Sequence, residues 1–82
     1  MTILFQPIEL ALPARAVDAR LVLYDGRLCA VLSLLDPLVD GAAGWFVEAA
    51  FGRLQDPFNP TFPDLASAEA WVAAKMSGHH PG

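Results

Sequence analysis

The feature that most constrains the fold of this chain is a short reversal, Asp25-Gly26, between two strand-like segments. Val17 to Tyr24 and Arg27 to Leu35 flank it, and both are rich in aliphatic residues. Asp-Gly readily adopts the positive φ angles that both central positions of a type I′ turn require. The sequence therefore predicts a two-stranded antiparallel hairpin with a defined register.

That register pairs Tyr24 with Arg27, and an unbroken ladder continues to Val17 opposite Leu34. Directly opposed side chains point to the same face of a sheet. One face then collects only apolar residues: Val17, Ala19, Leu21, Leu23, Leu28, Ala30, Leu32 and Leu34. The other face is mixed: Asp18, Arg20, Val22, Tyr24, Arg27, Cys29, Val31, Ser33 and Leu35. We expect the first face to be the core side.

Two more strands are predicted around this hairpin. Trp45 to Phe51 reads as a third strand, with Phe46 beside Glu48 on the outer side and four residues on the core side: Trp45, Val47, Ala49 and Phe51. Ile3 to Leu12 reads as a fourth strand, confined to the sheet edge by its internal Pro7. Residues 36–44 read as a loop, and prolines exclude regular structure from 54–63.

The C-terminal part predicts one helix, from Leu65 to Met76, rich in strong helix formers. Asp64 is placed to cap its first turn, and Gly78 to follow its end. One apolar stripe runs along it: Leu65, Ala68, Trp71, Val72 and Met76.

The expected fold class is therefore α+β: a three- to four-stranded antiparallel meander, packed on one face by a single C-terminal α-helix. With 82 residues there is room for one domain, which we place at residues 1–78, followed by a flexible tail at 79–82.

Composition points to an interaction surface. Hydrophobic residues make up 55% of the chain and charged residues 17%, so part of the apolar surplus must lie on the surface of so small a domain. If the single helix covers one face, five apolar side chains of the mixed face form a possible interface: Val22, Tyr24, Val31, Leu35 and Phe46. The alternative is that loops and the N-terminal segment cover them. Self-association, most simply an isologous homodimer, or contact with another protein is the leading functional hypothesis.

The proline-rich segment carries a second possibility. Phe58 and Phe62 either fold over the core edge or form a lip that contacts a peptide or ligand. A pocket between this segment and the sheet, with Cys29 or Tyr24 nearby, would be the basis of an alternative ligand-binding or enzymatic function.

Reactive groups are sparse, so we predict no catalytic, cofactor-binding or metal-binding residue and favour a non-enzymatic role. His79 and His80 are adjacent in the expected tail, which is poor geometry for a metal site. Cys29 is the sole cysteine, and in mid-strand it reads as a small hydrophobe, although Arg20 and Arg27 on its face could activate it weakly. Asp18 and Glu48 read as partners in surface ion pairs.

Nucleic acid and membrane are not expected as partners. The formal net charge is −4, and the five basic residues are scattered. Three strands followed by a helix that opens with Phe62-Pro63-Asp64 resemble small DNA-arm-binding domains. This resemblance implies DNA contact through the sheet, but the sheet offers only Arg20 and Arg27 among acidic residues.

No segment reads as a signal peptide or membrane span, and a lone thiol fits a reducing compartment, so we expect a cytoplasmic protein. The excess of arginine over lysine and the abundance of alanine suggest a bacterial source.

Overall fold

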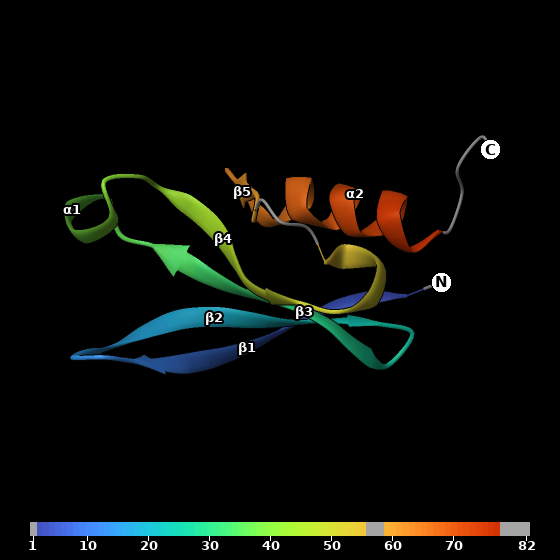
Figure 1. Ribbon diagram of the computed structural model, residues 1–82, viewed down its shortest axis with the longest axis horizontal. Helices are drawn as coiled ribbons and strands as arrows, with labels where there is room; N and C mark the ends of the chain where they lie inside the picture. The colour runs from blue at the N-terminus through green and yellow to red at the C-terminus, as the bar shows by residue number, and fades with distance from the viewer. Residues whose placement is uncertain (1, 56–58, 78–82) are drawn as a thin grey trace.

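The computed structural model describes residues 2–55 and 59–77, and its main elements are a five-stranded antiparallel sheet and one C-terminal helix (Figure 1). The strands follow the chain in meander order: β1 (Ile3–Leu12), β2 (Arg15–Tyr24), β3 (Arg27–Leu35), β4 (Gly44–Ala50) and β5 (Thr61–Phe62). Helix α2 (Leu65–Met76) ends the fold, and two short elements, α1 (Pro37–Asp40) and η1 (Gly52–Leu54), flank β4. The predicted α+β meander is confirmed, but with five strands instead of three to four.

The Asp25-Gly26 turn forms as predicted, with φ angles of 51° and 82°. Tyr24 pairs with Arg27 and Leu23 with Leu28, as expected. Then the register slips, because Val22 pairs with Ala30 and leaves Cys29 as the extra residue of a β-bulge. The predicted ladder is therefore wrong beyond the bulge.

This slip decides which residues of β2 enter the core. A one-residue shift turns every side chain of one strand to the other face relative to its partner. Leu32 lies opposite Arg20 instead of Ala19. As a result Val22, predicted on the mixed face, is fully buried with Leu32 in the core. Leu21, predicted on the core side with Leu32, lies on the opposite face with Val31.

The core lies between the sheet and α2. Its buried members are Val22, Cys29, Ala30, Leu32, Trp45, Val47, Leu54, Ala68 and Val72. Each fully buried Val or Leu among them contributes roughly 1.5–3 kcal/mol. The predicted helical stripe is confirmed, since Ala68 and Val72 are buried and Leu65, Trp71 and Met76 pack against the cluster. Helix α2 contacts β1, β5 and η1, so elements from both edges of the sheet surround it.

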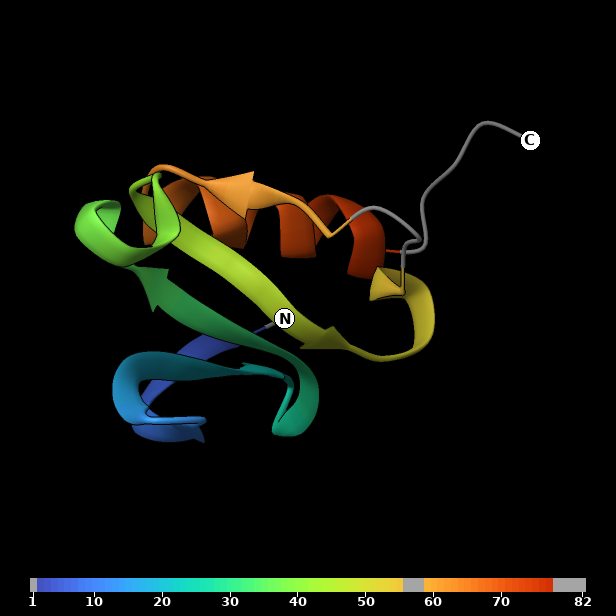
Figure 2. The same ribbon diagram turned by 60° about the vertical axis from the view of Figure 1, so that its left-hand side comes forward.

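A second bulge, in β4, determines which face of the sheet each β4 side chain points to. Val31 pairs with Ala49 but Leu32 pairs with Val47, which leaves Glu48 as the extra residue. Trp45 and Val47 point into the core, as predicted. The prediction is wrong for Ala49, which the bulge turns to the face of Val31, and for Phe51, which is 47% exposed. The bulged Glu48 accepts a hydrogen bond from Ser33 Oγ at 2.8 Å. The two bulges increase the twist, and β1 and β2 curl away beneath β3 while β4 and β5 lie alongside α2 (Figures 1 and 2).

Residues 54–63 contain more structure than expected. Leu54, the last residue of η1, is 1% exposed and belongs to the core. Further on, Phe62 pairs with Trp45, which makes β5 the fifth strand. Pro60 and Pro63 flank this short edge strand, where a missing backbone donor is tolerated. The expected loop at 36–44 likewise begins with the helical turn α1, which Asp36 caps through a hydrogen bond from Leu38 N.

The predicted helix start at Asp64 is confirmed, because its carboxylate caps α2 by accepting a hydrogen bond from Ser67 N at 2.8 Å. This hydrogen bond lowers the pKa of Asp64 below its usual 3.8. The stabilisation is therefore complete above that pH and is lost as pH falls through the lower folded-state pKa. We expect Asp64→Ala to lower the melting temperature at pH 7, and we expect this loss to shrink as the pH falls below 3.8. Asp64→Asn, which keeps a capping oxygen, should retain most of the stability at pH 7. Thermal melts followed by circular dichroism check both; a pH-independent loss would contradict the capping role.

Candidate interaction surfaces

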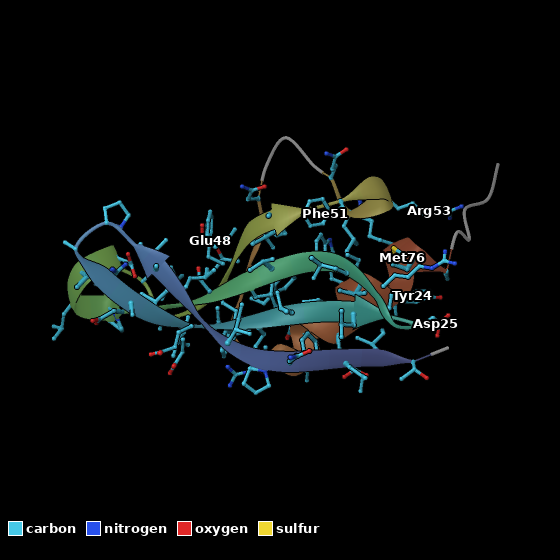
Figure 3. All side chains as sticks on the ribbon, turned by 90° about the horizontal axis from the view of Figure 1, so that it is seen from below. Tyr24, Asp25, Glu48, Phe51, Arg53 and Met76 are labelled. Carbon is cyan, nitrogen blue, oxygen red and sulfur yellow. The ribbon has the colours of Figure 1, made fainter. Side chains whose placement is uncertain are left out.

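One face of the sheet carries an almost continuous apolar surface. We call it the open face, because α2 packs against the opposite face of the sheet; Figure 3 shows the open face toward the viewer, with α2 behind the sheet. By register its apolar members are Leu4, Ile8, Leu10, Leu12, Val17, Ala19, Leu21, Leu23, Leu28, Val31, Leu35, Phe46 and Ala49. Of these, Val17 and Ala19 are buried.

The open face is most exposed near the β2–β3 turn. Leu4 pairs with Leu23, which pairs with Leu28, so three leucines form one row across β1, β2 and β3. Leu4 is 54% exposed and Leu28 43% exposed. Exposed leucines in register on neighbouring strands form a contiguous patch, and such patches mark association sites.

At its other end the open face is hollowed and its polar groups are paired. A hollow of about 360 Å³ lies there, lined by Leu12, Val17, Leu35 and Phe46 among others. Arg15 at its rim makes an ion pair with Asp40 of α1 at 3.1 Å. Together with the Ser33–Glu48 hydrogen bond, this pair satisfies the polar side chains around the hollow.

The five possible interface residues divide between the two faces. Val31, Leu35 and Phe46 lie half-buried on the open face. Val22 is 0% exposed, so its predicted exposure is wrong, and Tyr24 packs against the core. The bulge at Cys29 causes this exchange, because it puts Leu21 and Leu23 of β2 on the open face instead. Sequence alternation could not have identified these two leucines, since β2 is apolar on both sides from Leu21 to Tyr24.

A cleft of about 530 Å³ opens where the β2–β3 turn, η1 and the end of α2 meet. Its lining residues are Tyr24, Asp25, Arg27, Leu28, Cys29, Phe51, Gly52, Arg53 and Met76. Figure 3 shows the labelled members of this set gathered at one end of the molecule. Tyr24 and Cys29 line this cleft, but it is not the pocket predicted between the proline-rich segment and the sheet, because among the described residues η1 and α2, and not residues 59–63, form its other walls.

Cys29 lines this cleft with a buried thiol. It is buried, and its Sγ donates to the carbonyl oxygen of Val22 at 3.4 Å. Burial raises the pKa of the thiol above its ordinary value of 9.0. A thiol that stays protonated at neutral pH is a poor nucleophile. The geometry therefore favours the small-hydrophobe interpretation of Cys29.

Phe62 lies over the core edge and not on a protruding lip. Its ring centroid is 5.2 Å from that of Trp71, with the planes tilted by 45°. Aromatic pairs at this spacing stabilise packing beyond the area they bury. Phe58, the other residue proposed for a loop contact, lies outside the described residues, as do Gly78, His79 and His80.

Within residues 2–55 and 59–77, no group of three or more His, Cys, Asp or Glu side chains could hold a metal ion. No helix in the same part of the chain is long and apolar enough to cross a membrane. Comparisons with family models, curated proteins and solved structures find no match to this chain.

Proposed function

We propose that this chain acts through protein–protein contact, and that its open face pairs with the same face of a second copy. The observation that carries the proposal is the in-register leucine row of Leu4, Leu23 and Leu28 on the sheet face opposite α2. An isologous pairing of two such faces would bury apolar surface from both copies at once.

The charge distribution supports an apolar partner surface. A charged partner protein is attracted to an interface by unpaired charges of the opposite sign. On the open face, however, Arg15 is already paired with Asp40, and Glu48 is hydrogen-bonded to Ser33. A second copy offers the same uncharged leucine row, and the carboxylate of Glu48, which has no ion pair among the described residues, lies at the other end of the face. Two sheets packed face to face in this way resemble the layers of a β-sandwich.

Sedimentation equilibrium should give a mass of twice 8.8 kDa at micromolar concentrations. The double substitution Leu4→Lys and Leu28→Lys places two charges at the ends of the leucine row in each copy. Because burial of unpaired charges is unfavourable, we expect the dimer to weaken by roughly a hundredfold or more. Both positions are exposed, so the fold should be retained by circular dichroism.

A matched control uses Leu38→Lys with Val39→Lys. These residues of α1 are 96% and 63% exposed and lie outside the sheet, and they undergo the same change in charge and hydrophobicity. The control pair should leave the dimer intact. A monomeric wild-type chain at high concentration would refute the proposal, and so would a control pair that dissociates the dimer as effectively as the test pair.

A further inference from the structure

The cleft between the β2–β3 turn, η1 and the end of α2 combines apolar walls with a basic rim. Tyr24 of β2, Phe51 between β4 and η1, and Met76 of α2 supply aromatic and thioether surface. Phe51 is 47% exposed, which is unusual for a phenylalanine beside a buried core. The volume of about 530 Å³ lies within the range typical of small-molecule sites, roughly 300–1,000 Å³.

The basic side chains of the rim have no ion-pair partner among the described residues, whereas its acidic side chain accepts a hydrogen bond. Arg27 and Arg53 line the cleft, and they are two of only five basic residues in a chain of net charge −4. Neither arginine forms an ion pair among the described residues. The ion pair found in that part of the chain joins Arg15 and Asp40. Asp25, the acidic residue of the rim, already accepts a hydrogen bond from Thr2 N at 2.7 Å.

Two unpaired guanidinium groups on an apolar cleft match a ligand with one anionic end. Arginine presents a planar fork of donors that binds a carboxylate with two parallel hydrogen bonds. The aromatic and thioether walls match a ring or branched apolar group attached to that carboxylate. Both halves of such a ligand would meet complementary surface at the same time.

We propose that this cleft binds a small aromatic carboxylate, with its ring against Phe51, Tyr24 and Met76 and its carboxylate at Arg27 and Arg53. This inference is separate from the proposed dimer, since of the cleft residues only Leu28 also belongs to the open face. No chemical step is assigned to the cleft, and its thiol is buried and hydrogen-bonded.

Titration of the whole chain with 2-naphthoate, followed by amide chemical shifts and calorimetry, tests the proposal. We expect saturable shifts at the β2–β3 turn, η1 and the end of α2. 2-Naphthylmethanol, which keeps the ring without the charge, and acetate, which keeps the charge without the ring, should each bind at least roughly tenfold more weakly.

Three variants assign the contacts. Arg27→Gln with Arg53→Gln should weaken naphthoate binding roughly tenfold or more and leave the weak naphthylmethanol affinity unchanged. Phe51→Ala should weaken both ring-bearing probes. Lys75→Gln removes a basic residue that does not line the cleft and should change neither. Equal affinities for naphthoate and naphthylmethanol would overturn the proposal. It would also be overturned if naphthoate failed to bind while a peptide ending in a hydrophobic residue did bind.

Discussion

Val22→Asp is expected to abolish folding, whereas Leu21→Asp at the adjacent position is expected to leave a folded chain. Val22 is 0% exposed and sits in the core beside Leu32. A carboxylate at Val22 would be buried without a partner, which costs several kcal/mol. Small domains have total stabilities of about 5–15 kcal/mol, and a chain of this length belongs near the lower end.

Leu21 is half-buried on the open face, where a carboxylate can reach water. We expect Leu21→Asp to lower the free energy of unfolding by about 1–2 kcal/mol and to weaken the proposed dimer. Chemical denaturation followed by circular dichroism gives the free energies. The dispersion of amide resonances reports whether Val22→Asp retains tertiary structure.

Leu32→Asp serves as the control, because Leu32 faces the core in the regular register and in the bulged one. It should unfold the chain in either case. The two β2 variants distinguish the registers: an unbulged hairpin would place Leu21 in the core and Val22 outside. A folded Val22→Asp variant beside an unfolded Leu21→Asp variant would therefore contradict the bulge at Cys29.

The sequence predicted this hairpin correctly only where local chemistry determines it. Asp25-Gly26 sets the turn and the two pairs next to it, and the structure confirms both. Farther along, β2 is apolar from Leu21 to Tyr24, so alternation cannot distinguish one register from the next. Helix α2 was predictable to its ends, because Asp64 caps it locally and its apolar stripe has helical spacing.

The slip itself depends on contacts that are distant in sequence. The register slip turns Arg20 toward the side of β2 that faces Trp45. A prediction from the hydrophobic pattern disfavours a charged residue on that side. The guanidinium lies 5.0 Å from the centroid of the Trp45 ring, a cation–π arrangement that makes the position favourable. Such a contact between β2 and β4 is invisible to any argument from the hairpin alone.

The cleft was predictable only in part for the same reason. Tyr24 and Cys29 lie near the turn and were expected beside a pocket. Arg53 and Met76 come from η1 and the end of α2, which meet the turn only in the folded chain. The expected irregularity of residues 54–63 also hid η1, whose Leu54 fills the core.

Gly44→Ala is expected to destabilise the chain far more than Gly41→Ala, although both glycines have positive φ angles. Gly44 begins β4 with φ of 112°, a backbone conformation that side chains rarely adopt. A Cβ there would overlap the carbonyl oxygen of Phe62 and approach its carbonyl carbon at 3.2 Å. These are backbone atoms of β5, so relief requires β5 to move away from β4.

We expect Gly44→Ala to lower the free energy of unfolding by about 2–6 kcal/mol, from backbone strain and overpacking together. Gly41, with φ of 74° and no atom within 4 Å of the position that an added Cβ would take, should lose only about 1–2 kcal/mol. Phe62 pairs with Trp45 and packs against Trp71. Displacement of β5 should therefore shift tryptophan emission to longer wavelength in Gly44→Ala, and Gly41→Ala should show no such shift. Urea denaturation and fluorescence of the two variants measure these effects. Equal losses with unchanged emission would mean that β5 does not pack against Gly44, and that the fifth strand lies elsewhere.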